Sequence, residues 1–176
     1  FFKAPHFGGF REEMAHVLLV DMSIHHFDAV RSLLESDPVA VYAEEYNPAW
    51  SWFRADANAA AVFEFEGGIR FTYTGSWCAP GHETSWNGRW RVSAAGGTAL
   101  WDGDGAPEVA LGDELRGIAL EPEPEQIDGS LAEFVACLRE GRNPDTDARS
   151  NVLSLAMVEK TLARKSGSAG MPRPSS

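Results

Sequence analysis

Hydrophobic positions near the start of the chain recur with a helical period. Residues 21–35 place an apolar side chain every three or four positions, the spacing of one buried helix face, at Ile24, Phe27, Val30 and Leu34. Asp37-Pro38 ends this pattern, because proline cannot donate to the helical hydrogen-bond ladder and restricts the residue before it. Residues 1–14 show no clean period, and we expect a connector there that could include a short strand.

From residue 39 to residue 120 the period changes to two, which indicates short strands. Strands over 61–66 and 69–74 are separated by Gly67-Gly68, which tolerate the positive φ angles of a tight hairpin turn. Gly96-Gly97 joins a second pair of strands, and a third pair follows over 109–111 and 115–120. Neighbouring strands joined by short turns predict an antiparallel sheet.

After residues 121–124 the helical period returns. Ser130 and Glu133 have the spacing of a capping box, so we expect a helix to begin at Ser130 and to end at Gly141. A last helix is predicted over about 148–165. The order of elements predicts an α+β fold, an open, mainly antiparallel sheet with helices packed on one face. We expect one domain over residues 1–166 and a disordered tail over 167–176, which is rich in Ser, Gly and Pro.

The composition restricts the possible partners and compartments. The chain has 176 residues and a net charge of −11, which argues against nucleic acid or an anionic membrane as the main partner. No apolar run approaches the roughly 18 residues of a membrane span. Cys78 and Cys137 lack metal-finger spacing, so we expect reduced thiols and a cytoplasmic location. The chain starts at Phe1 with no signal-peptide pattern, and we expect a fragment, a processed product or the ordered part of a longer protein.

The first candidate for chemistry is the series Asp21, His25 and Asp28, at spacings of four and seven positions. On a helix that begins near Asp21 these side chains would point to one side. An aspartate beside a histidine orients the imidazole and favours its protonated form, which suits proton transfer to and from a hydroxyl or carbonyl group. The alternative is structural: Asp21 caps the helix, and His25 is a hydrogen-bonded, half-buried residue.

The loop over residues 76–88 is a second candidate, with His82 and Trp86 as possible substrate-binding residues. Indole faces stack on the C–H faces of sugars, and polar groups bind sugar hydroxyls. Alternatively, Trp77 and Trp86 pack against the sheet edge. A metal site would combine His25 with His26 or His82, but adjacent helical histidines diverge and no HExxH or HxH motif is present, so we expect no metal ligands.

One family matches the motif around His25. The run over residues 18–28, LLVDMSIHHFD, followed by Arg31-Ser32-Leu33-Leu34, resembles the LLDxGxHxxDxxRxLL pattern of the Gfo/Idh/MocA oxidoreductases, specifically of their C-terminal domain. Residues 75–77, 86–92, 129–134 and 154–160 also resemble strands and helices of that domain, in the same order. Ser23 departs from the pattern, because the family usually has glycine there.

The resemblance implies functional roles for three residues. Asp21 and His25 would be catalytic: His25 would accept the proton of a substrate hydroxyl while hydride leaves for the nicotinamide, and Asp21 would orient it. Asp28 matches a recurrent family aspartate, either a substrate ligand or a structural residue. The neighbouring His26, turned about 100° away on an ideal helix, should face the core or the substrate's edge without a proton-transfer role.

The resemblance also implies a cofactor that this sequence cannot hold. Family members bind NAD or NADP on an N-terminal Rossmann domain that carries a Glu-Lys-Pro motif. Here no GxGxxG follows a strand, no P-loop or GxSxG is present, and Glu159-Lys160 is followed by Thr161. We therefore expect no cofactor-binding residues in this chain and no activity from it alone.

Three functional hypotheses follow. The first is the substrate-binding and assembly domain of an NAD(P)-dependent oxidoreductase that acts on a sugar or polyol hydroxyl, joined into a homodimer or tetramer through the open sheet face. The second is a non-enzymatic oligomerisation or ligand-binding module. The third is a metal-dependent enzyme built around the histidine pair.

Overall fold

The computed structural model describes residues 1–120, 124 and 126–163. Three helical segments come first: α1 (Phe10–Glu13), the π-helical η1 (Leu18–Ser23) and α2 (Ile24–Leu34). The strands are β1 (Pro38–Tyr46), β2 (Asn58–Phe65), β3 (Arg70–Ser76), β4 (Trp90–Ala94), β5 (Gly97–Trp101), β6 (Glu108–Leu111) and β7 (Glu114–Gly117), with the 3-10 turn η2 (Glu66–Gly68) between β2 and β3. Two helices close the described chain, α3 (Gln126–Glu140) and α4 (Ala148–Ala163).

The strands form two antiparallel sheets rather than one. Strands β1, β2 and β3 make the first sheet with β2 in the centre, and β4 to β7 make a second sheet in chain order. Both predicted hairpins are present, but the second turns one residue earlier than the predicted Gly96-Gly97, because Gly97 belongs to β5. Gly67 and Gly68 have φ angles of 70° and 81° between β2 and β3, and the turn between β4 and β5 lies at residues 95–96. The hydrogen-bond ladder breaks between β3 and β4, where the loop over residues 77–89 intervenes.

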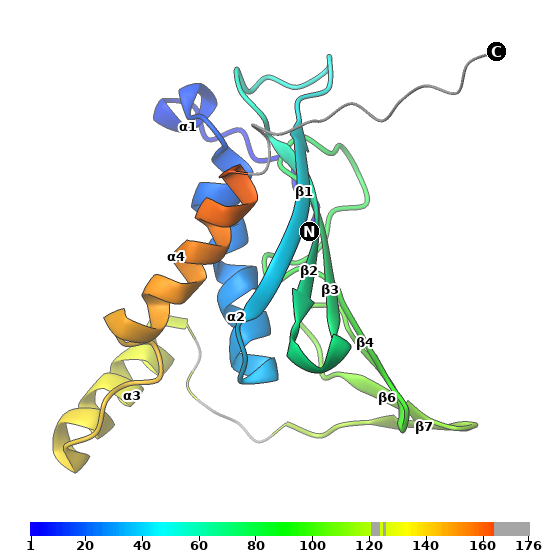
Figure 1. Cartoon of the computed structure of the whole chain (residues 1–176), viewed down its shortest axis with the longest axis vertical. Helices are drawn as coiled ribbons and strands as arrows, with labels where there is room; N and C mark the ends of the chain where they lie inside the picture. The colour runs from blue at the N-terminus through cyan, green and yellow to red at the C-terminus, as the bar shows by residue number, and fades with distance from the viewer. Residues whose placement is uncertain (121–123, 125, 164–176) are drawn as a thin grey trace.

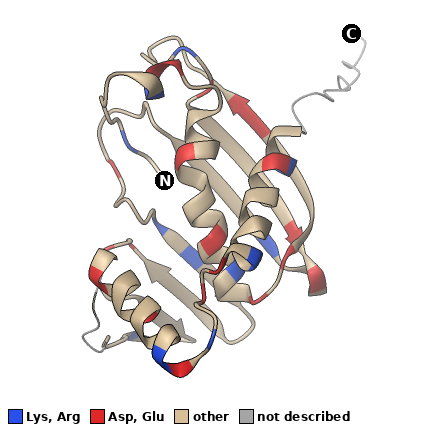
Figure 2. Cartoon of the chain, turned by 90° about the vertical axis from the view of Figure 1, so that its left-hand side faces the viewer, with Lys and Arg blue, Asp and Glu red and all other residues tan. Residues whose placement is uncertain are grey.

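Helices cover one face of the first sheet, as Figures 1 and 2 show. The alternation along β2 explains this, because its buried apolar residues share one phase of the strand: Ala59, Ala61, Phe63 and Phe65. Phe27 of α2 packs edge-on against Phe63, with ring centroids 4.9 Å apart, and Met157 of α4 joins the same core. The predicted α+β class, with antiparallel strands and helices on one side, is confirmed.

Two predicted helix starts are wrong. Helical structure begins at Leu18 rather than near Asp21, so Asp21 lies inside η1 and does not cap the helix. Helix α3 begins at Gln126, which leaves Ser130 in its interior. The Ser130 hydroxyl donates to the carbonyl oxygen of Gln126 at 3.1 Å, a bond to the preceding helical turn that competes with capping. The predicted stop at Gly141 is confirmed by its φ of 69°.

The amino-terminal connector contains more structure than its sequence indicates. It forms α1, and Phe2 makes an isolated parallel bridge to Ser76 at the end of β3. The predicted tail over 167–176 and the last two residues predicted for α4 lie outside the described residues. Among the helices that the structure describes, none combines the length and the apolar character needed to cross a membrane.

Candidate functional site

A pocket of about 550 Å³ lies between α2 and the second sheet. Its walls are largely apolar, and polar groups enter it from α2 and from the loop before β4. The lining residues are Met22, His25, His26, Ala29, Leu33, Trp86, Asn87, Trp90, Val92, Ala99, Leu100, Trp101 and Pro107. The volume suits a monosaccharide-sized ligand, and an apolar wall with a few polar groups is typical of small-molecule sites.

Two tryptophans of the β4–β5 hairpin form one wall. Trp90 pairs with Trp101 across the antiparallel ladder. The indole N–H of Trp90 donates to the carbonyl oxygen of Asn87 at 2.7 Å, and that of Trp101 donates to Gly105 at 2.6 Å. Because neighbouring backbone satisfies both indole N–H groups, the rings are fixed in orientation. Sequence analysis missed this wall, although a hairpin centred on residues 95–96 places Trp90 opposite Trp101.

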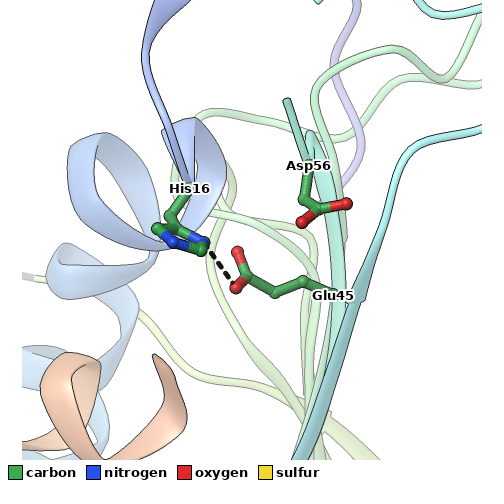
Figure 3. A group of neighbouring side chains, drawn as sticks. All are labelled: His16, Glu45 and Asp56. Carbon is green, nitrogen blue, oxygen red and sulfur yellow. Dashed lines mark hydrogen bonds and ion pairs between the residues drawn. The ribbon is translucent and has the colours of Figure 1, made fainter. Parts of the chain in front are cut away.

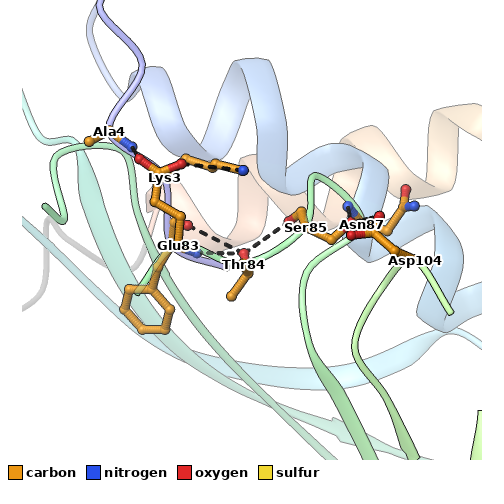
Figure 4. Close-up of polar contacts among 8 residues, drawn as sticks. Lys3, Ala4, Glu83, Thr84, Ser85, Asn87 and Asp104 are labelled. Carbon is orange, nitrogen blue, oxygen red and sulfur yellow. Dashed lines mark hydrogen bonds and ion pairs between the residues drawn. The ribbon is translucent and has the colours of Figure 1, made fainter. Parts of the chain in front are cut away.

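The loop before β4 is tied to the amino-terminal segment, as Figure 4 shows. The Phe2 amide donates to the Thr84 hydroxyl at 3.0 Å, and Thr84 returns a backbone bond to Phe2 at 2.9 Å. Glu83 accepts from the Ala4 amide at 3.1 Å and pairs with Lys3 at 3.3 Å. These contacts hold the backbone directly before Trp86.

The two tryptophans of this loop have different surroundings. Trp86 lines the pocket, is 47% exposed and also packs against Phe1 and Phe7, so its role as a substrate ligand stays a prediction. Trp77 is only 1% exposed and belongs to the hydrophobic core. His82 is exposed, has a φ of 47°, and is not among the residues that line the pocket. Its role as a substrate ligand therefore stays a prediction without support from the geometry.

The two adjacent histidines have different surroundings. His25 is exposed at the pocket. His26 is 4% exposed and lies among the rings of Phe1, Tyr73 and Trp90. Its Nε2 is 3.3 Å from the carbonyl oxygen of Trp86, so this nitrogen carries the proton. Burial lowers the pKa of His26 to about 4, because a charged imidazole would lose its hydration there. Of the predicted positions for His26, facing the core, the sheet or the substrate's edge, the structure combines burial among aromatic rings with a place in the pocket wall.

The Asp21 carboxylate is held by a cation rather than by His25. Arg11 of α1 donates to it from Nε at 2.8 Å and from a second nitrogen at 3.4 Å. A two-pronged guanidinium–carboxylate pair is stronger than a bond to a neutral imidazole, which explains this choice of partner. The expected Asp21–His25 contact is therefore not what the structure shows, and Asp21 remains a predicted catalytic residue.

Asp28 points toward α4 instead of the pocket. The Ser154 hydroxyl donates to its carboxylate at 2.5 Å, and Arg31 lies 3.7 Å from the same oxygen. Arg31 also donates to the Ser154 hydroxyl at 2.8 Å. These contacts join α2 to α4, so the geometry favours the structural role for Asp28 over substrate binding.

Ser23, at the position where the resembling motif has glycine, has a local role. It is fully buried at the end of η1. Its hydroxyl donates to the carbonyl oxygen of Leu18 at 3.1 Å and lies 2.9 Å from the hydroxyl of Tyr73. Burial raises the pKa of Tyr73 above its usual range, which keeps that phenol neutral. A side chain at this position thus satisfies a buried carbonyl of the π-helical turn and ties η1 to β3.

A larger pocket of about 750 Å³ lies between β1 and α4. Asp37 and Lys160 are its charged groups, and its remaining lining residues are apolar. Its lining residues include no histidine and none of the residues predicted from the motif. The pocket beside α2 is therefore the better candidate for proton-transfer chemistry.

Solved structures share the fold of this chain. The chain aligns with an oxidoreductase from Agrobacterium radiobacter in complex with NAD⁺, L-tartaric acid and magnesium, at a TM-score of 0.81 and 15% identity over 95% of this chain and 53% of that one. It aligns with an aldose-aldose oxidoreductase from Caulobacter crescentus complexed with glycerol at a TM-score of 0.76 and 20% identity, over 93% of this chain and 50% of that one. It also aligns with a UDP-N-acetylglucosamine 3-dehydrogenase from Acidithiobacillus ferrooxidans at a TM-score of 0.77 and 14% identity, over 93% of this chain and 50% of that one. At these identities the likeness shows the fold.

The chain spans about half the length of these solved structures. It is also 30% identical over 96 residues to an uncharacterized protein, y4oX, from Sinorhizobium fredii, covering 54% of this chain and 27% of that protein. The model of the GFO/IDH/MocA C-terminal domain matches residues 4–102, which is more than half of the chain and includes the His25 motif and the pocket-forming β4–β5 hairpin. This chain therefore belongs to the GFO/IDH/MocA oxidoreductase family, as a C-terminal domain of that family.

Proposed function

We propose that this chain is the substrate-binding and assembly half of an NAD(P)-dependent oxidoreductase that acts on a hydroxyl group of a sugar or polyol. One observation carries the proposal: an exposed histidine of the family motif, His25, opens into a pocket walled by Trp86, Trp90 and Trp101. Three of the matched proteins are described by their activity or bound molecule as acting on or binding an aldose, UDP-N-acetylglucosamine, glycerol or tartaric acid, all of them polyhydroxy compounds. Those names favour a polyhydroxy substrate here.

In this proposal the tryptophan faces bind the C–H face of the sugar, and His25 accepts a proton from its hydroxyl group. His26 does not suit that role, because its Nε2 already carries the proton donated to the Trp86 carbonyl and its other nitrogen, Nδ1, is buried away from the pocket opening. The Asp21–Arg11 pair places a fixed charge pair one helical turn before His25. We propose that Asp21 supports the imidazolium through this local field.

The residues present do not fit a dinucleotide. Dinucleotide sites of the Rossmann type need a parallel strand–loop–helix unit with a glycine-rich turn. In the described residues every strand pairing within the two sheets is antiparallel. NAD or NADP would therefore be held by a separate domain, and the role proposed for this chain is limited to binding the substrate and moving its proton.

A test requires this chain joined to a cofactor-binding domain encoded before Phe1. Aldoses and polyols are screened with NAD⁺ and NADP⁺, following the reduced nicotinamide by absorbance. His25→Ala should lower kcat by about a hundredfold or more, the usual loss for a general base. Folded His26→Ala is the matched control and should change stability or KM more than kcat. Full turnover in His25→Ala with loss of turnover in His26→Ala would contradict the assignment.

The alternative function is a ligand-binding or oligomerisation module without an enzyme. The pocket beside α2 would serve this alternative as a simple ligand-binding site. The encoded sequence before Phe1 distinguishes the two functions. If it lacks a strand followed by GxGxxG and a downstream Glu-Lys-Pro motif, the non-enzymatic alternative is favoured over the enzyme.

We also propose that the uncovered face of the first sheet joins copies of the chain into a dimer or tetramer. Tyr42, Val62 and Thr72 form one cross-strand row on this outer face. Tyr42 is 73% and Val62 41% exposed. An exposed row with apolar members on a flat sheet suits a self-complementary contact.

A further inference from the structure

Three potential metal ligands meet at the far end of the first sheet, outside the pocket (Figure 3). His16 precedes η1, Glu45 lies next to the last residue of β1, and Asp56 lies just before β2. One ligand atom from each residue lies within 4.8 Å of the other two. They come from three separate segments, so the fold itself brings them together.

The cluster contains a buried carboxylate. The Glu45 side chain is 2% exposed, and its Oε2 lies 2.7 Å from Nδ1 of His16. An ionised carboxylate is costly to bury unless its charge is balanced. A divalent cation held by both carboxylates and the imidazole would supply positive charge directly beside the buried Glu45 carboxylate.

The backbone fixes the position of His16. Its φ is 56°, in the left-handed region that non-glycine residues seldom occupy. Such a conformation is unfavourable for a residue with a side chain, and residues of this kind gather at ligand clamps. The His16 carbonyl oxygen accepts from the Val20 amide at 2.9 Å, which ties the residue to the first turn of η1. The imidazole is therefore aimed at Glu45 by the turn that starts the helical segment.

We propose that His16, Glu45 and Asp56 bind a divalent transition metal ion, for which Zn²⁺ is the best fit. One imidazole with two carboxylates suits Zn²⁺ better than Mg²⁺ or Ca²⁺, which prefer oxygen ligands alone. With Zn–ligand bonds of about 2.0–2.2 Å, neighbouring ligand atoms of a tetrahedral site lie roughly 3.3–3.6 Å apart.

The cluster needs small side-chain shifts to reach that geometry. The distance between His16 Nδ1 and Glu45 Oε2, now 2.7 Å, would increase by less than about 1 Å. Any pair of ligand atoms now separated by up to 4.8 Å would move closer together. The His16 side chain is 34% exposed, which gives the ion a route in and leaves a fourth position to water. The bound ion would clamp the start of η1 to β1 and to the segment before β2.

The test uses the 176-residue chain after treatment with a chelator. Titration with Zn²⁺ should show one ion per chain by calorimetry. At a Zn²⁺ concentration about a hundredfold above Kd, Tm should rise by roughly 5–10 °C, because the ion binds the folded chain alone. Mg²⁺ at the same concentration should leave Tm unchanged.

Matched variants locate the site. His16→Asn and Asp56→Asn should each raise the Kd for Zn²⁺ at least tenfold, since loss of even an outer-shell partner costs about 10–100-fold. Asparagine also tolerates positive φ, so the turn at His16 is preserved. His82→Asn is the control, because His82 is an exposed histidine with a φ of 47° outside the cluster. The Kd of the His82→Asn variant for Zn²⁺ should stay within twofold of the Kd of the unsubstituted chain.

Two results would overturn the proposal: no Zn²⁺ binding by the unsubstituted chain, or a Kd unchanged by His16→Asn. If His16→Asn does not fold, X-ray absorption at the zinc edge on the unsubstituted chain decides. One imidazole among nitrogen and oxygen ligands at about 2.0–2.1 Å supports the site, and two imidazoles or none refutes it.

Discussion

The burial of His26 predicts a specific loss of stability in mild acid. A free histidine titrates near 6.5, whereas burial lowers the pKa of His26 in the folded chain to about 4. The unfolded chain therefore binds a proton on this side chain at pH values where the folded chain does not. The contribution of His26 to stability is complete above about pH 6.5 and is lost progressively as the pH falls toward 4.

The size of this effect follows from the shift. At about 1.4 kcal/mol per pKa unit, a change from 6.5 to about 4 is worth roughly 3 kcal/mol in full. At pH 5 the unfolded histidine is almost fully protonated and the folded one is almost neutral, so about 2 kcal/mol should be lost relative to pH 7.5. Desolvation is the main cause of the shift, and the charge of His25 acts in the same direction.

The perturbation that isolates the effect is His26→Phe. Phenylalanine keeps an aromatic ring among Phe1, Tyr73 and Trp90 but cannot titrate or donate to the Trp86 carbonyl. At pH 7.5 the variant should be less stable by about 1 kcal/mol for the lost hydrogen bond. Between pH 7.5 and pH 5 the unsubstituted chain should lose about 2 kcal/mol more than the variant.

Urea unfolding of both proteins at the two pH values measures this difference. Shared titrating groups that do not interact with His26 cancel in the comparison, so the remainder reports His26 and its coupling to its neighbours. A difference between the proteins that changes by less than about 0.5 kcal/mol would refute the reasoning, because a free-energy change of that size corresponds to a pKa shift well below one unit. A direct NMR titration of the imidazole should show it neutral at pH 5.

Two further predictions concern the role of Asp28 and the outer face of the first sheet. Asp28→Ala removes the carboxylate that accepts from Ser154, and the free energy of unfolding should fall by about 1–3 kcal/mol while polyol binding, followed by tryptophan fluorescence, stays unchanged. Weaker polyol binding at unchanged stability would instead place Asp28 in the substrate site. Val62→Glu introduces a charge at the centre of the Tyr42–Val62–Thr72 row and should shift light-scattering mass toward the monomer. If the unsubstituted chain is already a monomer at micromolar concentration, the proposed assembly through this face is wrong for this chain.

Much of the secondary structure could be predicted because local physics specifies it. The alternation over β2 and β3 and the glycines at 67–68 produce a hairpin whatever packs against it. The Gly141 stop and the period of α2 are local in the same way. The errors lie at helix starts, where Ser130 had a capping pattern but preferred the carbonyl of the previous turn.

Partner choice in the candidate site could not be predicted from spacing. The four-residue interval between Asp21 and His25 allows a contact, but Arg11, ten positions before Asp21, competes for the carboxylate and holds it. Asp28 was expected near the same site, yet Ser154, distant in sequence, takes its carboxylate. Both outcomes depend on charges and hydroxyl groups that tertiary packing brings close.

The sequence by itself determined the class of fold, the hairpins, the separation of His25 from His26 and the likeness to an oxidoreductase domain. These depend on periodicity, turn chemistry and a motif within one helix, which are short-range properties. Tertiary structure alone decided that Trp86 joins Trp90 and Trp101 beside His25, and that His16, Glu45 and Asp56 meet from three segments. Contacts between distant segments depend on how sheets and helices stack, and no local pattern encodes that distance.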